Sequence, residues 1–244
     1  MIAVERVYKS FDQPVLRGCS LRVAHAEIVG LVGPAASGKS VLLRSLAGLQ
    51  KVDAGSIRVM GQEVVDATSE QLRGVRRHIG MLFQNVALFD FMSVFENVAF
   101  PLRRTAQLPP DEVERRVRAE LDAVGLGGLG ERAPASLSGG QQRRVGLARA
   151  AVTRPRILLY DEPAAGLDPV STARVFSLIR EQRARLGASI IVVSSDVDRV
   201  VQAVDQVVML HHGRALFQGS PAQVLTSPQR LVRQFFGAEA HGPT

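Results

Sequence analysis

Cysteine, aromatic residues and long apolar runs are all scarce in this sequence of 244 residues. The single cysteine, Cys19, excludes an internal disulfide framework and a cysteine-rich metal site. Aromatic residues make up 5% of the chain and do not alternate with the arginines, so no stacking platform for single-stranded nucleic acid is visible. The longest apolar runs, such as residues 190–193, fall far short of the roughly 18 residues that span a bilayer. No secretory signal opens the chain, so we expect a soluble intracellular protein with no nucleic-acid partner.

What is present is the composition of a folded domain. Hydrophobic residues make up 46% and charged residues 22%, which excludes disordered and fibrous classes. The length suits one α/β domain with an inserted lobe, and no internal repeat is seen. The net charge of +7 favours phosphates or anionic lipid head groups as partners. Only Lys9, Lys39 and Lys51 are lysines, so a lysine at a chemically demanding position is noticeable.

The first half of the chain predicts a strand, a glycine-rich turn and a helix in succession. The apolar run at residues 28–32 is typical of a buried strand. Apolar residues at helical spacing follow over residues 40–49, and Gly48 stands near the expected end of that helix. The turn between them fits the phosphate-loop pattern GxxxxGK[ST] at every fixed position. Its residues are Gly33, Pro34, Ala35, Ala36, Ser37, Gly38, Lys39 and Ser40.

This pattern carries specific chemistry. Glycines let backbone N–H groups turn inward around an anion, and the following helix adds its positive N-terminal end. We expect Lys39 to reach the β- and γ-phosphates of a nucleotide and the Ser40 hydroxyl to bind Mg²⁺. The structural alternative is a flexible Gly/Ser loop, which the strand–loop–helix context disfavours.

A second apolar strand, at residues 157–160, ends in two carboxylates. Asp161 is expected to face the metal, and Glu162 to polarise the attacking water. Alone, this pair would more often be a solvated strand end. Together with a phosphate loop, it predicts a nucleotide-hydrolysing site.

A third element, LSGGQ at residues 137–141, opens a helix that runs to about residue 150. Its serine and two glycines leave backbone N–H groups free for a second anion. One nucleotide does not need two such helix ends from one chain. We therefore predict that this end grips ATP held by another subunit, and an ordinary helix cap is the alternative. The residues concerned are Ser138, Gly139, Gly140 and Gln141.

With these three elements in this order, the whole chain resembles the ATP-binding subunit of ABC transporters. The resemblance implies an α/β P-loop NTPase core with an N-terminal antiparallel β subdomain and an inserted helical subdomain. It implies ATP and Mg²⁺ as ligands, and a homodimer that buries two ATP molecules. The core then covers residues 1–90 and 151–226, the helical subdomain about 91–150, and a tail 227–244. Within that lobe we expect a helix capped by Ser93 and Glu96, and another over residues 112–124.

The resemblance also assigns further site residues. Phe11 matches the position of an aromatic residue that stacks on adenine, and Val41 follows the phosphate loop among the nucleotide contacts. Gln84 matches the glutamine that links the metal site to the helical lobe. Asp168, after Gly166 and Leu167, matches a loop that crosses the dimer interface. Taken alone, Phe11, Gln84 and Asp168 are more simply a core phenylalanine, a surface glutamine and a turn before a proline.

One position departs from the family pattern. Where the family usually has a histidine near the γ-phosphate, after the strand at residues 189–193, this chain has Ser195. His211 and His212 lie too late, in an expected hairpin before Gly213. A serine can donate one hydrogen bond but cannot become cationic near neutral pH. ATP binding is therefore expected to be intact, while Ser195 puts efficient hydrolysis in question.

The segment after Gln84 bears on the partner. Phe89, Phe91, Met92 and Phe95 cluster too closely for all to point inward along one helix stripe. A methionine–aromatic groove can receive a partner helix, and the resemblance implies docking of a membrane permease there. Two stretches are similar to the Mla-type, MCE-associated lipid transport ATPases. They are the residue sequence at 87–103 and the tail that contains Phe235, Phe236 and Gly242-Pro243.

The resemblance implies an ATPase subunit on the cytoplasmic face of the inner membrane, powering phospholipid or hydrophobic-compound transport. Three alternatives remain: an importer ATPase for small polar solutes such as amino acids, a soluble assembly ATPase of the iron–sulfur scaffold type, and a nucleotide-gated clamp that hydrolyses ATP weakly because of Ser195.

Overall fold

The computed structural model describes residues 1–105 and 108–237 and divides the chain into two units. The first unit comprises Met1–Arg76 and Ser189–Thr244, and the second comprises Arg77–Ala188. The predicted helical subdomain, residues 91–150, falls inside the second unit. That unit also contains one strand before the subdomain, and one strand and a long helix after it. Gly242-Pro243 lie outside the described residues.

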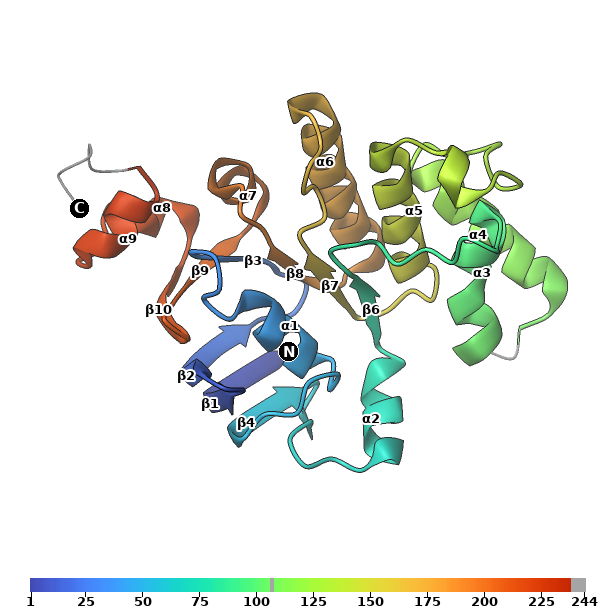
Figure 1. Ribbon diagram of the computed structural model, residues 1–244. Coiled ribbons are helices and arrows are strands. Elements are labelled where there is room, and N and C mark those ends of the chain that lie inside the picture. Colours follow the sequence, from blue (N-terminus) through green and yellow to red (C-terminus); the bar gives the residue numbers. More distant parts are fainter. Residues whose placement is uncertain (106–107, 238–244) are drawn as a thin grey trace. The chain divides into compact units, whose positions relative to one another are not determined.

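The first unit contains an antiparallel sheet and a mainly parallel one (Figure 1). Its elements are β1 (Ile2–Ser10), β2 (Pro14–Val23), β3 (Ile28–Val32), α1 (Lys39–Leu46), β4 (Ala54–Val59), β5 (Gln62–Glu63), α2 (Ser69–Arg76), β8 (Ser189–Val193), α7 (Val197–Ala203), β9 (Gln206–His211), β10 (Arg214–Gly219), α8 (Pro221–Leu225) and α9 (Arg230–Phe235). The antiparallel sheet has the order β2-β1-β4-β5. In the other sheet, β3 pairs parallel with β8 and β9, and β10 closes a hairpin with β9. This confirms the expected α/β class.

Local sequence explains these boundaries. β3 is buried at every position, as its continuous apolar run predicts. β1 continues beyond the alternating residues 2–4 because a register shift after Val4, with Arg6 at a φ of 47°, breaks the alternation without ending the strand. α1 ends at Leu46, just before the left-handed Gly48 with a φ of 64°. The hairpin predicted around His211 and His212 is β9–β10.

The second unit is largely helical. Its elements are β6 (Ile79–Leu82), α3 (Val94–Thr105), α4 (Pro110–Ala123), a 3₁₀ turn at Pro134–Ser136, α5 (Gly139–Ala151), β7 (Ile157–Asp161) and α6 (Pro169–Leu186). β6 and β7 pair in parallel. α3, α4 and α5 pack against one another, as the green and yellow helices of Figure 1 show.

The helix starts of this unit follow capping chemistry. Ser93 and Glu96 exchange side-chain-to-backbone hydrogen bonds of 3.2 and 2.8 Å, which confirms the predicted capping box. α4 begins two residues before the predicted start, because Pro110 occupies its first turn, where a missing N–H costs nothing. No helix within the described residues is long and apolar enough to cross a membrane.

Candidate nucleotide site

The phosphate loop joins β3 to α1, and its backbone requires glycine at two positions. Gly33 has a φ of 144°, and a Cβ there would lie 2.0 Å from the Leu210 carbonyl oxygen. Gly38 has a φ of 102°, and its Cβ would lie 2.9 Å from a Leu16 methyl group. No side chain caps the start of α1 at Gly38, so the positive end of that helix opens into the loop. The loop therefore has the form of an anion cradle.

The Lys39 side chain folds back onto this loop. Its Nζ donates hydrogen bonds of 2.8 Å to the carbonyl oxygens of both Gly33 and Pro34. The neighbouring Ser37 hydroxyl is buried and, among the described residues, has no hydrogen-bond partner. A buried polar atom without a partner marks a place built for one. An ammonium and a hydroxyl are thus gathered where phosphate oxygens are expected.

The two carboxylates that follow β7 differ in environment. Asp161 is fully buried, whereas Glu162 is half-buried and holds a left-handed backbone with a φ of 50°. The Ala165 N–H donates to the Glu162 carbonyl at 3.2 Å, so a tight turn maintains this conformation. A left-handed conformation at a residue other than glycine costs energy and is concentrated at functional sites. The strain falls on the residue predicted to direct water.

The LSGGQ segment forms the capped start of α5. The Ser138 hydroxyl accepts from the Gln141 N–H at 3.3 Å, and the Gln141 side chain accepts from the Ser138 N–H at 2.9 Å. Among the described residues, a Cβ on Gly139 or Gly140 would have its nearest neighbour at 3.9 or 3.6 Å. Packing within the chain therefore does not require glycine at either position, which leaves close approach from outside as the physical reason for it.

A hollow of about 240 Å³ lies beside this helix start. It is lined by Ser138, Gly140, Gln141, Arg144, Val170, Ser171, Arg174 and Val175. Burial, followed by the nearby charge of Arg174, lowers the pKa of Arg144 from its usual value. The two like charges make the hollow electropositive.

Two residues assigned by the resemblance have local roles as well. Gln84 is exposed, and its carbonyl oxygen accepts a hydrogen bond from Arg143. Asp168 caps α6 by accepting from the Val170 and Ser171 N–H groups, each at 2.9 Å. A hydrogen bond from the Ser171 side chain, followed by the one from its backbone N–H, lowers the pKa of the Asp168 carboxyl. The simpler alternative of a turn before Pro169 therefore also holds.

Phe11 is 56% exposed, so the alternative of a core phenylalanine is wrong. The Lys9 ammonium lies 5.2 Å from the centre of its ring. Asp53 anchors that lysine at 2.7 Å and also accepts from the Ser10 N–H at 2.6 Å. The exposed ring thus has a cation at a fixed place beside it.

Ser195 lies exposed just beyond β8. Its neighbour Ser194 is buried and accepts from the Asp196 N–H at 3.1 Å, and the Asp196 side chain caps α7 by accepting from the Arg199 N–H. His211 and His212 lie in the β9–β10 hairpin with their ring centres 4.2 Å apart. The serine therefore occupies the strand end where the family's histidine was expected.

The aromatic segment before α3 is partly exposed. Phe91 is 82% exposed, while the Phe89 ring packs 4.9 Å from Phe100 and 5.8 Å from Phe91. The buried Asn97 amide bonds both the N–H and the carbonyl of Phe89, at 2.8 and 3.0 Å. Met92 and Phe95 are half-buried. The segment presents an apolar surface on a fixed backbone.

Two arginines of α5 make contacts that the sequence did not predict. Arg143 donates to the carbonyl oxygens of Gln84 and Ala165, and Arg149 to those of Val86 and Ala87. Val86 and Ala87 both have left-handed backbones, with φ values of 57° and 51°. Burial lowers the pKa of both arginines. Their positions just after LSGGQ, on the helix that it opens, were the available signal.

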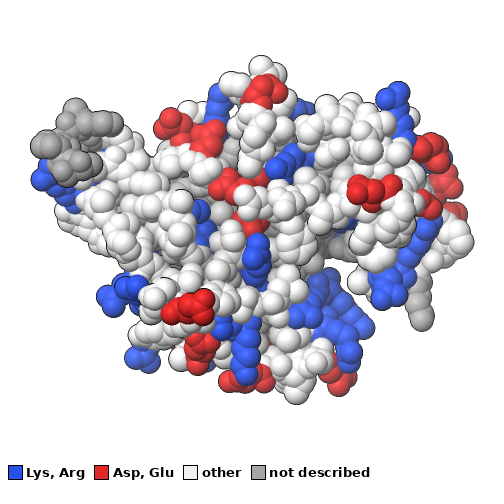
Figure 2. Space-filling view, viewed as in Figure 1, with Lys and Arg blue, Asp and Glu red and all other residues white. Residues whose placement is uncertain are grey.

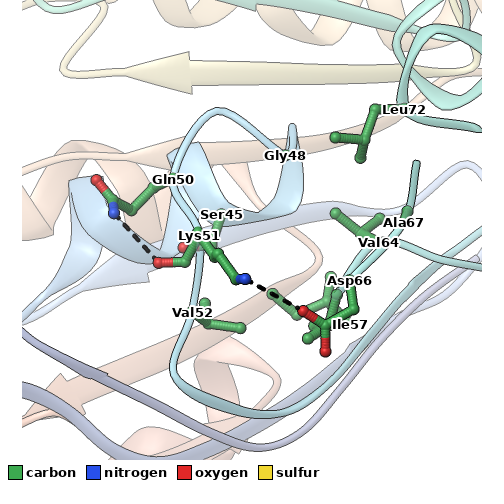
Figure 3. Close-up of a pocket in the computed structure, with 11 residues that line it drawn as sticks. Ser45, Gly48, Gln50, Lys51, Val52, Ile57, Val64, Asp66, Ala67 and Leu72 are labelled. Atoms are coloured by element: carbon green, nitrogen blue, oxygen red, sulfur yellow. Dashed lines mark hydrogen bonds and ion pairs between the residues drawn. The ribbon is translucent and has the colours of Figure 1, made fainter. Parts of the chain in front are cut away.

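A cavity of about 260 Å³ in the first unit contains none of the predicted site residues. Val52, Ile57, Val64 and Leu72 supply its apolar wall (Figure 3). The Lys51 ammonium lies 3.5 Å from the Asp66 carboxylate among the lining residues. Since both charged side chains are largely exposed, this pair contributes little to stability.

Surface charge is mixed on the face that Figure 2 shows. Lys and Arg form separate groups with Asp and Glu between them.

Comparison with known proteins identifies the family. The family model described as ABC transporter matches residues 16–165. The methionine import ATP-binding protein MetN of Rhodospirillum rubrum is 38% identical over 241 residues, which cover 97% of this chain and 68% of that protein. The chloroplastic protein TRIGALACTOSYLDIACYLGLYCEROL 3 of Arabidopsis thaliana is 38% identical, covering 100% of this chain and 75% of that protein. For the MetN proteins of Brucella, the chain spans 63% of their length.

The fold agrees with solved structures of ATP-binding cassettes. A dimeric post-hydrolysis state of the ATP-binding cassette MJ0796, bound to ADP and Pi, superposes with a TM-score of 0.84 at 26% identity. The match covers 91% of this chain and 99% of that one. With its phosphate loop, its LSGGQ helix and its two strand-end carboxylates, the chain is an ATPase cassette of the ABC transporter family.

Proposed function

We propose that the chain is the ATP-hydrolysing subunit of a membrane transporter and works as a homodimer on the cytoplasmic face of the membrane. The observation that carries this proposal is that the chain has both a phosphate loop held by Lys39 and a second helix start, at Ser138, whose glycines leave room for approach from outside. Each ATP is held between the phosphate loop of one chain and the LSGGQ helix of the other. The free space around Gly139 and Gly140 supports approach by a partner's nucleotide.

Within one site, the residues divide the work. The loop from Gly33 to Ser40, with Val41 next to it, holds the phosphates, and Lys39 neutralises their charge. Phe11 stacks on adenine, and Asp168 lies in the loop that crosses the dimer. Glu162 directs water toward the γ-phosphate.

The residues present fit a Mg²⁺ ion. Mg²⁺ prefers oxygen ligands, and the Ser40 hydroxyl, the Gln84 amide and the buried Asp161 carboxylate all supply oxygen. When bound, the ion would neutralise charge on the phosphates. Asp161 is fully buried at the end of β7, so its carboxylate is shielded from bulk water.

The permease is proposed to dock at the apolar segment formed by Phe89, Phe91, Met92 and Phe95. Phe91 is the anchor, because it is the most exposed of the four. Large exposed aromatic side chains are typical of interface hot spots. Asn97 holds the backbone of this segment, which reduces the entropy lost on docking.

For the cargo, we propose phospholipid or another hydrophobic compound. The residue sequence after Gln84 supports a hydrophobic cargo. Similarity over the full chain to a protein named for trigalactosyldiacylglycerol, a glycolipid, supports it as well. The second candidate is import of a small polar solute, which similarity to proteins named for methionine import favours. The two relatives are equally similar, so identity alone does not decide between these cargoes.

The test is phosphate release by the chain purified with the membrane proteins that it retains. Glu162→Gln serves as the blank, and we expect it to lower turnover by about a hundredfold or more while trapping an ATP-bound dimer. A variant that stays monomeric with ATP contradicts the sandwich dimer. Stimulation by phospholipid vesicles supports the lipid cargo, whereas stimulation by methionine supports the importer.

Ser195 decides between a transport ATPase and a weakly hydrolysing clamp. Ser195→His is expected to raise turnover by about tenfold if a missing imidazole limits the chemistry. Ser195→Ala then changes little. If the alanine variant loses nearly all activity, Ser195 has a catalytic role of its own and the assignment is wrong.

A further inference from the structure

Arg143 connects three segments of the second unit that the ATPase reaction needs. It belongs to α5, five positions after the Ser138 cap. One end of its guanidinium donates to the Gln84 carbonyl oxygen, and the other donates to the Ala165 carbonyl oxygen at 3.2 Å. Gln84 and Ala165 are 59 and 22 residues away in the sequence. One side chain thus bridges the segment of Gln84 and the turn that follows Glu162.

The chemistry of arginine suits this bridge. Its planar guanidinium presents N–H donors in a rigid fork, so two carbonyl oxygens are held at a set separation. Burial lowers the pKa of Arg143, while the negative charge of Glu162 raises it. The cation therefore lies close enough to Glu162 for their charges to interact. Its hydrogen bond to the Ala165 carbonyl oxygen restrains the turn that follows Glu162.

The helix that carries Arg143, α5, packs tightly against its neighbouring segments. A Cβ on Gly80 would lie 1.9 Å from the Ala150 carbonyl oxygen, so β6 approaches the backbone of α5 directly. A Cβ on Gly146 would lie 2.5 and 2.7 Å from the side chains of Leu82 and Val86. Such close packing leaves little room for α5 to shift against the segment of Gln84.

We propose that Arg143 is a positioning residue of ATP hydrolysis. It holds the Gln84 backbone and the Glu162 turn in register with the LSGGQ helix, and it does not contact the nucleotide. The inference rests on the proposed function, which assigns Gln84 and Glu162 to the reaction. Because Ser138 and Arg143 share one helix, the contact also joins the end that grips the partner's ATP to the groups that act on this chain's own ATP.

The experiment compares Arg143→Ala and Arg143→Lys with wild type. Arg118→Ala is the matched control, since Arg118 is an exposed arginine of the same unit that pairs with Glu114. Three quantities are measured: the turnover number for phosphate release, the Kd for ATP and the melting temperature. A positioning role predicts loss of turnover without loss of ATP affinity, because misplacing reactive groups slows chemistry more than binding.

For Arg143→Ala we expect turnover to fall by about tenfold or more, with the Kd for ATP within about twofold of wild type. Arg143→Lys keeps the charge but cannot span two carbonyls as a fork, so its turnover should fall at least about threefold and stay above that of the alanine variant. Arg118→Ala should match wild type.

A smaller fall than these in either variant overturns the proposal, as does a parallel loss of ATP affinity. If Arg143→Ala does not fold, Arg143→Lys decides alone by the same threefold limit. Wild type and Glu162→Gln, measured alongside, separate the two ideas. If wild type exceeds this blank while the Arg143 variants match wild type, only the positioning role fails; if wild type does not exceed it, the proposed function fails.

Discussion

The phosphate loop and the segments held by α5 are organised in different ways. In the phosphate loop, Lys39 bonds carbonyl oxygens only five and six residues away. In the second unit, Arg143 and Arg149 reach carbonyl oxygens about 60 residues away, at Gln84, Val86 and Ala87. The first arrangement joins residues that are close together in the sequence. The second exists only once distant segments have come together.

This difference affects how each region should fail. A local loop can lose a functional side chain without loss of the fold, because its backbone conformation depends on glycines and on α1. A region held by long-range contacts and tight packing should lose stability when one contact is altered.

The largest effect is expected for Lys39→Ala in the phosphate loop. Removing this charge should lower ATP turnover by about a hundredfold or more, because a preorganised charge on the phosphates is lost. The melting temperature should move by less than about 2 °C, since the Lys39 ammonium bonds carbonyl oxygens five and six residues away in its own loop. Phosphate release and a thermal scan provide both values.

Lys51→Ala is the control, because Lys51 is an exposed lysine of the same unit paired with Asp66. It should leave turnover unchanged. A Lys39 variant that unfolds early, or one that keeps wild-type turnover, would contradict the view of the loop as a self-contained cradle.

An intermediate effect is expected for Gly146→Ala in α5. The added Cβ would meet Leu82 and Val86 at 2.5 and 2.7 Å, so the free energy of unfolding should fall by about 1–3 kcal/mol. Gly74→Ala in α2 is the matched control, because nothing lies within 4 Å of its Cβ. That variant should gain up to about 1 kcal/mol from helix propensity. Equilibrium denaturation measures both, and a shift of the same sign in the two variants would show that α5 packing is not tight.

The same difference explains what the sequence could predict. The phosphate loop, β3, β7, the capping box at Ser93 and the helix start at Ser138 follow from consecutive residues, and the structure confirms them as elements. Their assigned roles in ATP chemistry stay predictions. The contacts of Arg143 and Arg149 could not be predicted this way, since arginines on a helix usually indicate a solvated face, and their partners at Gln84, Val86 and Ala87 lie about 60 residues away.

The strained backbone conformations could not be predicted from the sequence either. Glu162, Val86 and Ala87 adopt left-handed conformations that glycine would favour, yet none is glycine. Local preference argues against these conformations, and tertiary contacts from α5 and from the Glu162 turn maintain them. Asp168 illustrates the converse, since a turn before Pro169 was predicted from the sequence, and in the structure Asp168 caps α6 there.

The smallest effect is expected for Asp53→Asn, which acts on Phe11 through Lys9. The hydrogen bond from Lys9 is the main cause that lowers the pKa of Asp53 below its ordinary 3.8. Since the folded-state pKa is depressed, the contribution of this carboxylate is present above pH 3.8 and is lost as the pH falls through the lower, folded-state value. Wild type and Asp53→Asn should therefore differ in melting temperature at neutral pH and converge in acid.

The functional consequence concerns adenine. The Lys9 ammonium lies over the Phe11 ring, which is still 56% exposed, and we expect adenine to stack on that exposed surface. Without the carboxylate, Lys9 should lose its fixed position, and the Kd for ATP should rise by about two- to fivefold at unchanged turnover. Asp66→Asn, which breaks the exposed pair with Lys51, should leave the Kd unchanged. An equal change of the Kd in both variants would mean that net charge, rather than the placement of Phe11, governs ATP affinity. The proposal that Asp53 and Lys9 support Phe11 in binding adenine would then be wrong.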